Sequence, residues 1–161
     1  SLHDALPIYD NIIIKPLDLY QGMGVEKLHL HDLSSSKKSF KELVAVSKGP
    51  IITQPFYEQI NAGEIRAGYF KGKELGSILK VPKEGEFLAN IAQGASFDTV
   101  ELSAHQKGLC EKISKELHLQ GADLVAFDLL GDYVSEVNIT CPGLLVETSK
   151  AHGKNLCLDL I

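Results

Sequence analysis

Two acidic side chains and an amide surround a turn in the last third of the chain, and together they could hold a divalent metal ion. Glu136 and Asn138 are two residues apart on an expected strand, so their side chains leave the same face. Asp128 joins them if the turn pairs residue 128 with residue 136. A three-residue loop over 131–133 gives that register, whereas a two-residue loop pairs 128 with 135. Carboxylate and amide oxygens suit Mg²⁺ or Mn²⁺.

A second interpretation of the same residues is the wet face of an amphipathic hairpin. Polar and apolar side chains alternate on most antiparallel strands that have one face in solvent. Taken alone, Asp128 and Glu136 fit this interpretation better, by about two to one in our weighting of that pattern. The choice between the two depends on what the rest of the chain offers to a ligand.

Basic groups elsewhere suit a phosphate. Lys15 ends an apolar run and is followed by Gly22 and Gly24, whose backbone N–H groups are unshielded. Arg66 opens a later hairpin, where it could meet a phosphoryl group or be an ordinary surface arginine. The segment "TQPFY", residues 53–57, could offer backbone groups and aromatic rings to a purine, or could be a packed turn.

Strands in the first half of the chain are expected where apolar runs meet breakers. "NIIIK", 11–15, ends at Pro16, which lacks an N–H donor. "VEKLHLHD" alternates and predicts a second strand, and "IITQPF" a third. A helix is predicted over 34–49, with a serine cap and a terminal glycine.

The second half predicts an α+β arrangement. A hairpin is expected over 64–82 around Lys71-Gly72-Lys73, followed by a long ordered loop over 84–98. Ser103 and Gln106 form a capping box for a helix to about Leu119. Two strands, 122–130 and 133–139, and a short helix around 143–151 complete the chain.

Composition and charge limit the classes of function that the chain can have. The chain has 161 residues and a net charge of −5, which argues against nucleic-acid binding as its main task. No apolar run reaches the ~18 residues of a membrane span, so no membrane partner is expected. Three scattered cysteines predict a reducing, cytoplasmic setting. Residues 1–8, "SLHDALPI", resemble a translated adapter and are set aside as a non-native segment, which leaves 9–161 as the domain.

Four motifs in their order along the chain resemble the ATP-grasp carboxylate–amine ligases, most closely the C-terminal part of prokaryotic glutathione synthetase. They are "IIIKPLDLYQGMG", "ITQPFY", "GEIRAGYFKGKE" and "AFDLLGDYVSEVNITCP". The resemblance runs from about residue 10 to the C-terminus. It implies an ATP-grasp fold with an antiparallel or mixed sheet and flanking helices, here the second lobe, with the upstream lobe and N-terminal domain missing. The 161 residues alone are therefore expected to be inactive.

The resemblance also implies a role for individual residues. ATP and Mg²⁺ or Mn²⁺ are the implied cofactors, and Arg66 is the catalytic residue that stabilises the phosphoryl group in transfer. The nucleotide would contact Lys15, Gly22, Met23, Gly24, Gln54, Phe56, Tyr57 and Glu64. The metal ligands would be Asp128, Glu136 and Asn138, and the substrate residues Lys80, Asn90, Cys141 and Gly143.

The implied activity is the joining of γ-glutamylcysteine to glycine through an acylphosphate. The substrate side departs from the family pattern, because Lys80 and Leu88 stand where arginines are expected, and Cys141 and Gly143 replace hydroxyl residues. Two alternatives therefore stay open: an ATP-grasp ligase for another peptide or amino acid, and a nucleotide-binding module without catalysis. The partner is a small molecule or short peptide, and assembly into a homo-oligomer is left open.

Overall fold

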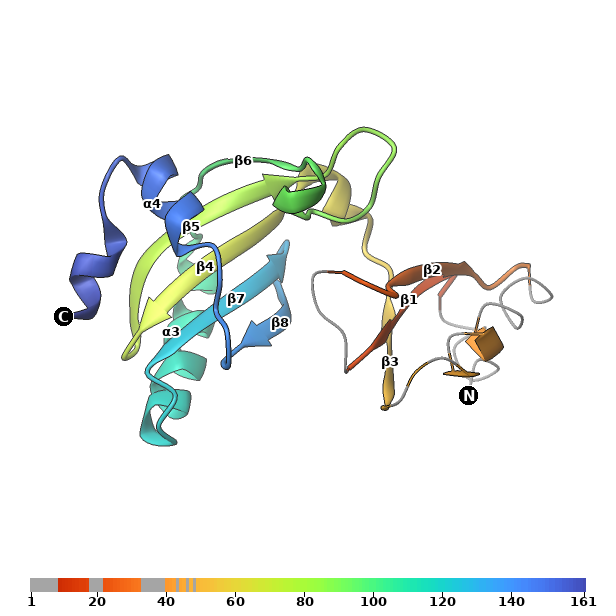
Figure 1. The fold of residues 1–161 in the computed structure, drawn as a ribbon, viewed down its shortest axis with the longest axis horizontal. Helices are drawn as coiled ribbons and strands as arrows, with labels where there is room; N and C mark the ends of the chain where they lie inside the picture. The colour runs from red at the N-terminus through yellow and green to blue at the C-terminus, as the bar shows by residue number, and fades with distance from the viewer. Residues whose placement is uncertain (1–8, 18–21, 33–39, 43, 46, 48) are drawn as a thin grey trace. The chain divides into compact units, whose positions relative to one another are not determined.

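The computed structural model divides the chain into two compact units, Ser1–Tyr57 and Glu58–Ile161. It describes residues 9–17, 22–32, 40–42, 44, 45, 47 and 49–161. Figure 1 shows the strands of each unit. The two units are described separately below.

The first unit contains a three-stranded antiparallel sheet in the order β2-β1-β3. Its strands are β1 (Asn11–Pro16), β2 (Glu26–His29) and β3 (Ile51–Pro55). Side chains alternate along β1, so Ile12 and Ile14 are buried on one face with Leu28 and Leu30. Phe40 and Ile51 pack against this small core.

All three predicted strands of the first unit are confirmed, and β1 ends at Pro16 as expected. The predicted helix over 34–49 falls largely outside the described residues, although 40–42, 44 and 45 are helical. Residues 1–8 and part of the glycine loop, 18–21, also lie outside the described residues.

The second unit is built on a five-stranded antiparallel sheet in the order β6-β5-β4-β7-β8. Its regular β-hairpins are β4–β5 and β7–β8, and its two α-helices follow β6 and β8 (Figure 1). The elements are η1 (Glu58–Ala62), β4 (Glu64–Phe70), β5 (Lys73–Val81), η2 (Ile91–Gln93), β6 (Ser96–Thr99), α3 (Ala104–Leu119), β7 (Leu124–Leu130), β8 (Tyr133–Asn138), α4 (Leu145–His152) and η3 (Leu156–Leu160).

The predicted hairpin over 64–82 is confirmed and turns at two residues. Lys71 and Gly72 have φ values of 47° and 79°, the left-handed pair that a type I′ turn requires. This turn twists with the strands, so β4 and β5 pair along nearly their whole length.

One face of this sheet forms the main core with α3. Ile65, Ala67 and Tyr69 of β4 point to it, together with Val125 and Phe127 of β7. The helix contributes the buried Cys110 and the packed Ile113 and Leu117. The Tyr69 and Phe127 rings meet edge to face, with centroids 5.4 Å apart.

The helix α3 begins where the sequence predicts. The Ser103 hydroxyl accepts from the Gln106 N–H at 3.2 Å, and the Gln106 carboxamide accepts from the Ser103 N–H at 2.9 Å, so the capping box is confirmed. Gln106 also donates to the Gly131 carbonyl at 2.9 Å, which connects the start of the helix to the β7–β8 turn.

On the opposite face of the sheet, α4 and η3 close over glycine backbone. A Cβ at Gly76 would lie 3.2 Å from His152 Nε2 and Thr148 Cγ2, and 3.3 Å from Leu156 Cδ1. His152 Nε2 lies 2.9 Å from the Ser77 carbonyl oxygen. The absence of a side chain at position 76 therefore lets α4 approach β5 closely.

The long loop predicted over 84–98 is partly wrong. Asn90 caps the short helix η2 through its side-chain oxygen, and residues 96–99 form β6, which pairs with β5. β6 is a short polar edge strand whose residues are mostly exposed, so it lacks the apolar alternation that would predict it. The other α-helix and strands of this unit are confirmed within two residues at each end.

The architecture is α+β, with antiparallel sheets and flanking helices. In the part of the chain that the structure describes, no helix combines the length and the apolar character needed to cross a bilayer.

Candidate functional site

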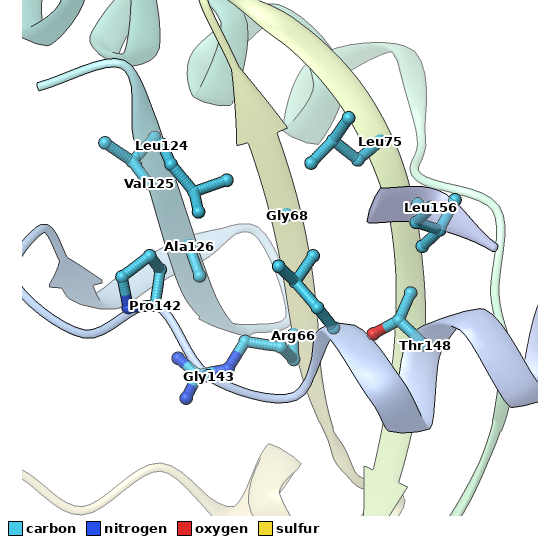
Figure 2. Close-up of a pocket in the computed structure, with 12 residues that line it drawn as sticks. Arg66, Gly68, Leu75, Leu124, Val125, Ala126, Pro142, Gly143, Thr148 and Leu156 are labelled. Atoms are coloured by element: carbon cyan, nitrogen blue, oxygen red, sulfur yellow. The ribbon is translucent and has the colours of Figure 1, made fainter. Parts of the chain in front are cut away.

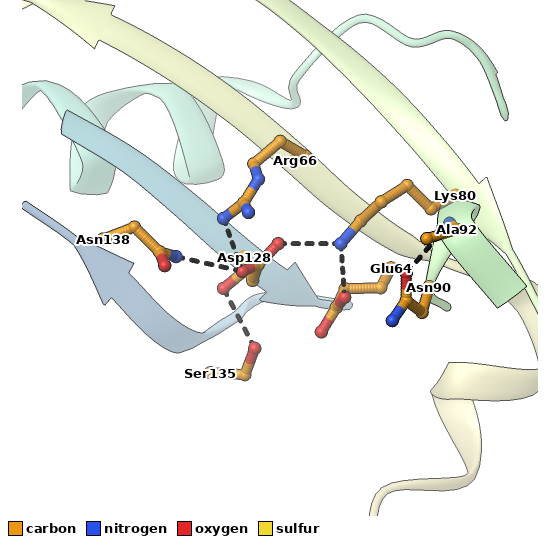
Figure 3. Close-up of polar contacts among 8 residues, drawn as sticks. All are labelled: Glu64, Arg66, Lys80, Asn90, Ala92, Asp128, Ser135 and Asn138. Carbon is orange, nitrogen blue, oxygen red and sulfur yellow. Dashed lines mark hydrogen bonds and ion pairs between the residues drawn. The ribbon is translucent and has the colours of Figure 1, made fainter. Parts of the chain in front are cut away.

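The second unit carries a line of four alternating charges on the sheet face opposite α3. Lys80 Nζ lies 2.7 Å from Glu64 Oε2 and 3.0 Å from Asp128 Oδ1, and Arg66 Nη1 lies 2.7 Å from Asp128 Oδ2. We call Glu64, Lys80, Asp128 and Arg66 the charged row. Figure 3 shows the row crossing β5, β4 and β7.

Strand register places these four residues together. Glu64 is opposite Lys80 in the β4–β5 pair, and Arg66 is opposite Asp128 in the β4–β7 pair. Directly opposed residues point to the same face of an antiparallel sheet. Because Glu64 and Arg66 are two apart on β4, all four side chains leave the same face.

The predicted pairing of Asp128 with Glu136 is confirmed, but the predicted three-residue turn is wrong. Leu130 pairs with Tyr133, so the turn has two residues, Gly131 and Asp132. A β-bulge then adds one residue to β8 at Ser135, and the register shifts so that Asp128 faces Glu136. The Ser135 hydroxyl donates to the Asp128 carbonyl at 3.1 Å across the bulge.

The bulge also explains why the side chains of Val134 and Glu136, which are two residues apart, lie on different faces of the sheet. Val134 packs against the main core, although Glu136 belongs to the face of Asp128. Two residues apart on a regular strand would share a face. The extra residue at Ser135 reverses that parity.

The charged row is buried enough for its pairing to matter. The exposed fractions of the Lys80, Asp128 and Arg66 side chains are 6%, 9% and 13%. Buried charges are costly unless they are paired and hydrogen-bonded. Each of these three has an oppositely charged partner within 3.0 Å, so the row is internally neutralised.

Burial and charge act in opposite directions on the pKa of two members of the row. Burial alone would lower the pKa of Lys80, but the carboxylates of Asp128 and Glu64 outweigh it, and the pKa is raised. Burial and the nearby Asp128 charge raise the pKa of Glu64, against the attraction of Lys80. Lys80 therefore carries its charge at neutral pH.

The residues predicted as metal ligands fit a hard divalent cation in their chemistry. Asp128 and Glu136 face each other, and Asn138 donates from its amide to Asp128 Oδ2 at 3.2 Å. Lys80 and Arg66 already contact both Asp128 oxygens. Among the described residues, no group of three His, Cys, Asp or Glu side chains could hold a metal ion. A metal here would therefore use the Asn138 oxygen and displace a cation contact from Asp128.

A small cavity adjoins Arg66 on the same face of the sheet (Figure 2). It is about 10 Å³, room for about one water molecule. The small residues Gly68, Gly76, Ala126 and Gly143 contribute to its wall. Arg66 Nε is buried and has no hydrogen-bond partner within the described part of the chain, so one guanidinium N–H is left to satisfy.

The predicted substrate residues are found in different settings. Gly143 borders the cavity and Cys141 is exposed nearby in sequence, before α4. Asn90 caps η2. Lys80 belongs to the charged row, where its ammonium lies between two carboxylates, a role that sequence reasoning missed. The opposite charges of Glu64 and Lys80 on the two strands of one predicted hairpin are a signal for their pairing, whereas the contact with Asp128 depends on a third strand.

The residues predicted to contact the nucleotide fall mainly in the first unit. Lys15 lies on β1 and Gln54 on β3, and Ile13 pairs with Gln54. Because Ile13 and Lys15 are two apart, Lys15 and Gln54 share the sheet face opposite the small core. The Phe56 N–H donates to the Asn11 carbonyl at 3.1 Å, which extends the β1–β3 pairing.

The described end of the glycine loop forms a tight turn. Gly22 and Gly24 have φ values of 75° and 70°, and the Val25 N–H donates to the Gly22 carbonyl at 3.3 Å. Met23 between them is 45% exposed. Tyr57 is half-buried at the end of the unit. Of the predicted nucleotide residues, only Glu64 lies in the second unit.

Sequence comparison places these motifs in a known family. The model of the prokaryotic glutathione synthetase ATP-grasp domain matches residues 1–153. A glutathione synthetase of Prochlorococcus marinus is 28% identical over 149 residues, which covers 92% of this chain and 48% of the relative. One of Mesorhizobium japonicum is 29% identical, with 92% and 47% covered. The chain spans about half the length of these curated relatives.

Solved structures show the same fold. A D-cycloserine synthetase superposes with a TM-score of 0.76 at 17% identity, covering 99% of this chain and 58% of the other. The D-alanine–D-alanine ligase of Bacillus anthracis complexed with ATP gives 0.66 at 21% identity, with 99% and 53% covered.

At sequence identities of 17% and 21%, the two structures establish the fold alone, which is that of the ATP-grasp ligases. The family model matches residues 1–153, a range that includes all four residues of the charged row. The chain belongs to the family of prokaryotic glutathione synthetase ATP-grasp domains.

Proposed function

We propose that the chain is the ATP-binding part of an ATP-dependent carboxylate–amine ligase that joins γ-glutamylcysteine to glycine. Membership of the glutathione synthetase family supports the reaction class. The observation that carries the proposal is the pairing of Arg66 with Asp128 at 2.7 Å, opposite Glu136 and beside Asn138. A guanidinium held by a buried carboxylate, next to oxygen donors for a cation, suits transfer of a phosphoryl group.

The proposed chemistry has two steps. A carboxylate oxygen of the acid attacks the γ-phosphorus of ATP, and ADP leaves, which gives an acylphosphate. The amine then attacks the acyl carbon and phosphate leaves. Arg66 donates to Asp128 Oδ2 at 2.7 Å, and its remaining N–H groups would stabilise the negative charge of the transferring group.

Mg²⁺ or Mn²⁺, when bound, would neutralise phosphate charge at the site. Asp128, Glu136 and Asn138 would hold it. On the nucleotide side, Lys15 would pair with phosphates under the turn of Gly22, Met23 and Gly24. Gln54, Phe56 and Tyr57 would line the base and Glu64 would reach the ribose.

The substrate side is proposed to use Lys80, Asn90, Cys141 and Gly143. One observation favours a second candidate, a ligase of the same type for another peptide or amino acid. The Lys80 side chain is 6% exposed and its ammonium contacts two carboxylates of the chain, which competes with binding of a substrate carboxylate. The proposed setting for either ligase is the cytoplasm, and the three cysteines are free thiols.

The test is ADP release in a full-length enzyme that carries this segment, since the 161 residues alone are proposed not to turn over. Release that depends on Mg·ATP, γ-glutamylcysteine and glycine together would support the first candidate. Release only with another acid and amine would support the second.

Glu136→Gln separates a ligase from a nucleotide-binding module. We expect ADP formation to fall by about 100-fold or more, because a charge at a phosphoryl-transfer site is lost. Glu116→Gln, on the exposed side of α3, makes the same chemical change away from the site and is the matched control. Equal activities of the two variants would contradict the proposed role.

A further inference from the structure

A lysine of the first unit that neither the family motifs nor the composition singled out covers an aromatic ring. Lys27 Nζ lies 3.6 Å from the centroid of the Phe56 ring, within the range of a cation–π contact. Lys27 is on β2 and Phe56 follows β3, with β1 between the two strands. The lysine side chain therefore reaches across β1 to meet the ring.

Strand register assigns Lys27 to the face of the sheet that carries Lys15 and Gln54. Ile13 pairs with Lys27 on one side and with Gln54 on the other. Lys15 is two residues beyond Ile13 on β1, roughly 6.8 Å from it along the strand, and its side chain leaves the same face. The small core of Ile12, Ile14 and Leu28 occupies the opposite face. Two cations, an amide and an aromatic ring thus share one surface.

We propose that Lys27 is a phosphate-binding cation of the nucleotide site, which leaves Phe56 when a base binds there. This inference rests on the proposed function. An ammonium over a ring and a stacked base compete for the same π-face. The base would take the place of the ammonium beside Gln54 and Phe56.

The length of the lysine side chain makes the exchange feasible. Lys27 has a flexible four-carbon stem and three N–H donors, so it can turn from Phe56 toward the phosphate groups expected near Lys15. A charge-assisted hydrogen bond to phosphate is stronger than a half-exposed cation–π contact. The exchange therefore favours nucleotides that carry phosphates over the bare nucleoside.

This mechanism predicts opposite effects of one substitution on two ligands. In Lys27→Met the ring is no longer covered by a cation, so adenosine should bind about two- to fivefold tighter. Mg·ATP loses a phosphate contact and should bind roughly tenfold more weakly. Dissociation constants for both ligands are measured by isothermal titration calorimetry on the full-length enzyme that carries this segment.

Three further variants complete the experiment. Lys112→Met, at an exposed position of α3, makes the same change of charge and should leave both constants unchanged. Lys27→Arg keeps the cation and its ring contact and should stay within about threefold of the wild type for both ligands. If Lys27→Met does not fold, Lys27→Gln removes the same charge with a polar side chain, and near-wild-type binding of both ligands by Lys27→Gln would overturn the proposal.

Each other pattern contradicts the proposal. Equal losses for adenosine and Mg·ATP in Lys27→Met would mean that Lys27 only positions Phe56. Unchanged constants would mean that Lys27 has no part in binding. If the wild-type full-length enzyme binds neither ligand, the proposed function fails and this inference with it, whereas binding by the wild type with no effect of Lys27→Met overturns this inference alone.

Discussion

Lys80 links two carboxylates of the charged row. Its ammonium is the only described contact between Glu64 and Asp128, because it lies within 3.0 Å of both carboxylates. Without it, two acidic groups on neighbouring strands would face each other with no cation between them. The charge pattern of the face thus depends on one lysine.

Lys80→Met should destabilise the protein by about 3 kcal/mol, because it leaves buried Asp128 with one cation fewer and Glu64 with none of the contacts described above. The free energy of unfolding is measured by urea denaturation. Lys112→Met is the control and should change it by less than about 0.5 kcal/mol. A loss below about 1 kcal/mol for Lys80→Met would show that the row relaxes without its lysine.

The three cysteines should differ in reactivity. Burial, and then the charge of Glu74, raise the pKa of the Cys110 thiol to about 12. Since a raised pKa keeps the thiol protonated, roughly one molecule in 10⁴ carries the thiolate at pH 8. Cys141 and Cys157 are exposed.

Iodoacetamide at pH 8 should therefore modify Cys141 and Cys157 and spare Cys110 in the native protein. Mass spectrometry of the intact chain and its peptides measures the sites. In urea the third thiol should react as well, which is the internal control. Rapid native modification of Cys110 would mean that α3 separates readily from the sheet.

At the scale of elements, the bulge at Ser135 decides which side chains meet. The two-residue turn alone would leave Val134 and Glu136 on one face, and the extra residue separates them. A deletion at this position should consequently be better tolerated than one in the turn beside it.

Deleting Ser135 keeps Leu129 opposite Val134 and Asp128 opposite Glu136, and should cost about 1 kcal/mol, the Ser135–Asp128 hydrogen bond. Deleting Asp132 removes half of the two-residue turn and should cost more than about 3 kcal/mol. Urea denaturation of both variants compares them. If the losses are equal, the bulge has a structural role beyond register.

Elements set by local rules could be predicted from the sequence, and those set by distant partners could not. The capping box of Ser103 and Gln106 lies within four residues, and the Lys71-Gly72 turn within two, so the sequence alone predicts both. The turn length at Gly131 was misjudged because nothing in "YVSEV" marks a bulge. β6 was missed because a short polar edge strand is defined by its pairing with β5.

The candidate site followed the same division. The resemblance named Arg66, Asp128 and Asn138, and the structure brings them into hydrogen-bond contact. The position of Lys80 between Glu64 and Asp128 needed the register of three strands, which a single sequence does not give. Lys27 was hidden for the same reason, because its partner Phe56 lies beyond an intervening strand.

Each of the two units has its own core among the described residues. The main core, from Ile65 to Leu129, is formed within Glu58–Ile161. A unit with its own core can fold alone in principle.

The segment 58–161 should therefore unfold cooperatively in urea as an isolated polypeptide. Circular dichroism and tyrosine fluorescence should report coincident transitions. Ala67→Asp, at a fully buried position of β4, should abolish the transition and is the control. A gradual, non-coincident loss of signal from the unaltered segment would show that it needs the first unit to fold.

Gly76 has a consequence for how such sequences can diverge. A methyl group there would press on Thr148 and His152 of α4 and on Leu156 of η3. Alanine at 76 therefore requires these side chains to move by a few tenths of an ångström or to become smaller, so the order of the changes matters. Across aligned descendants of this chain, position 76 should vary together with positions 148, 152 and 156, with alanine at 76 found beside a smaller residue at one or more of them.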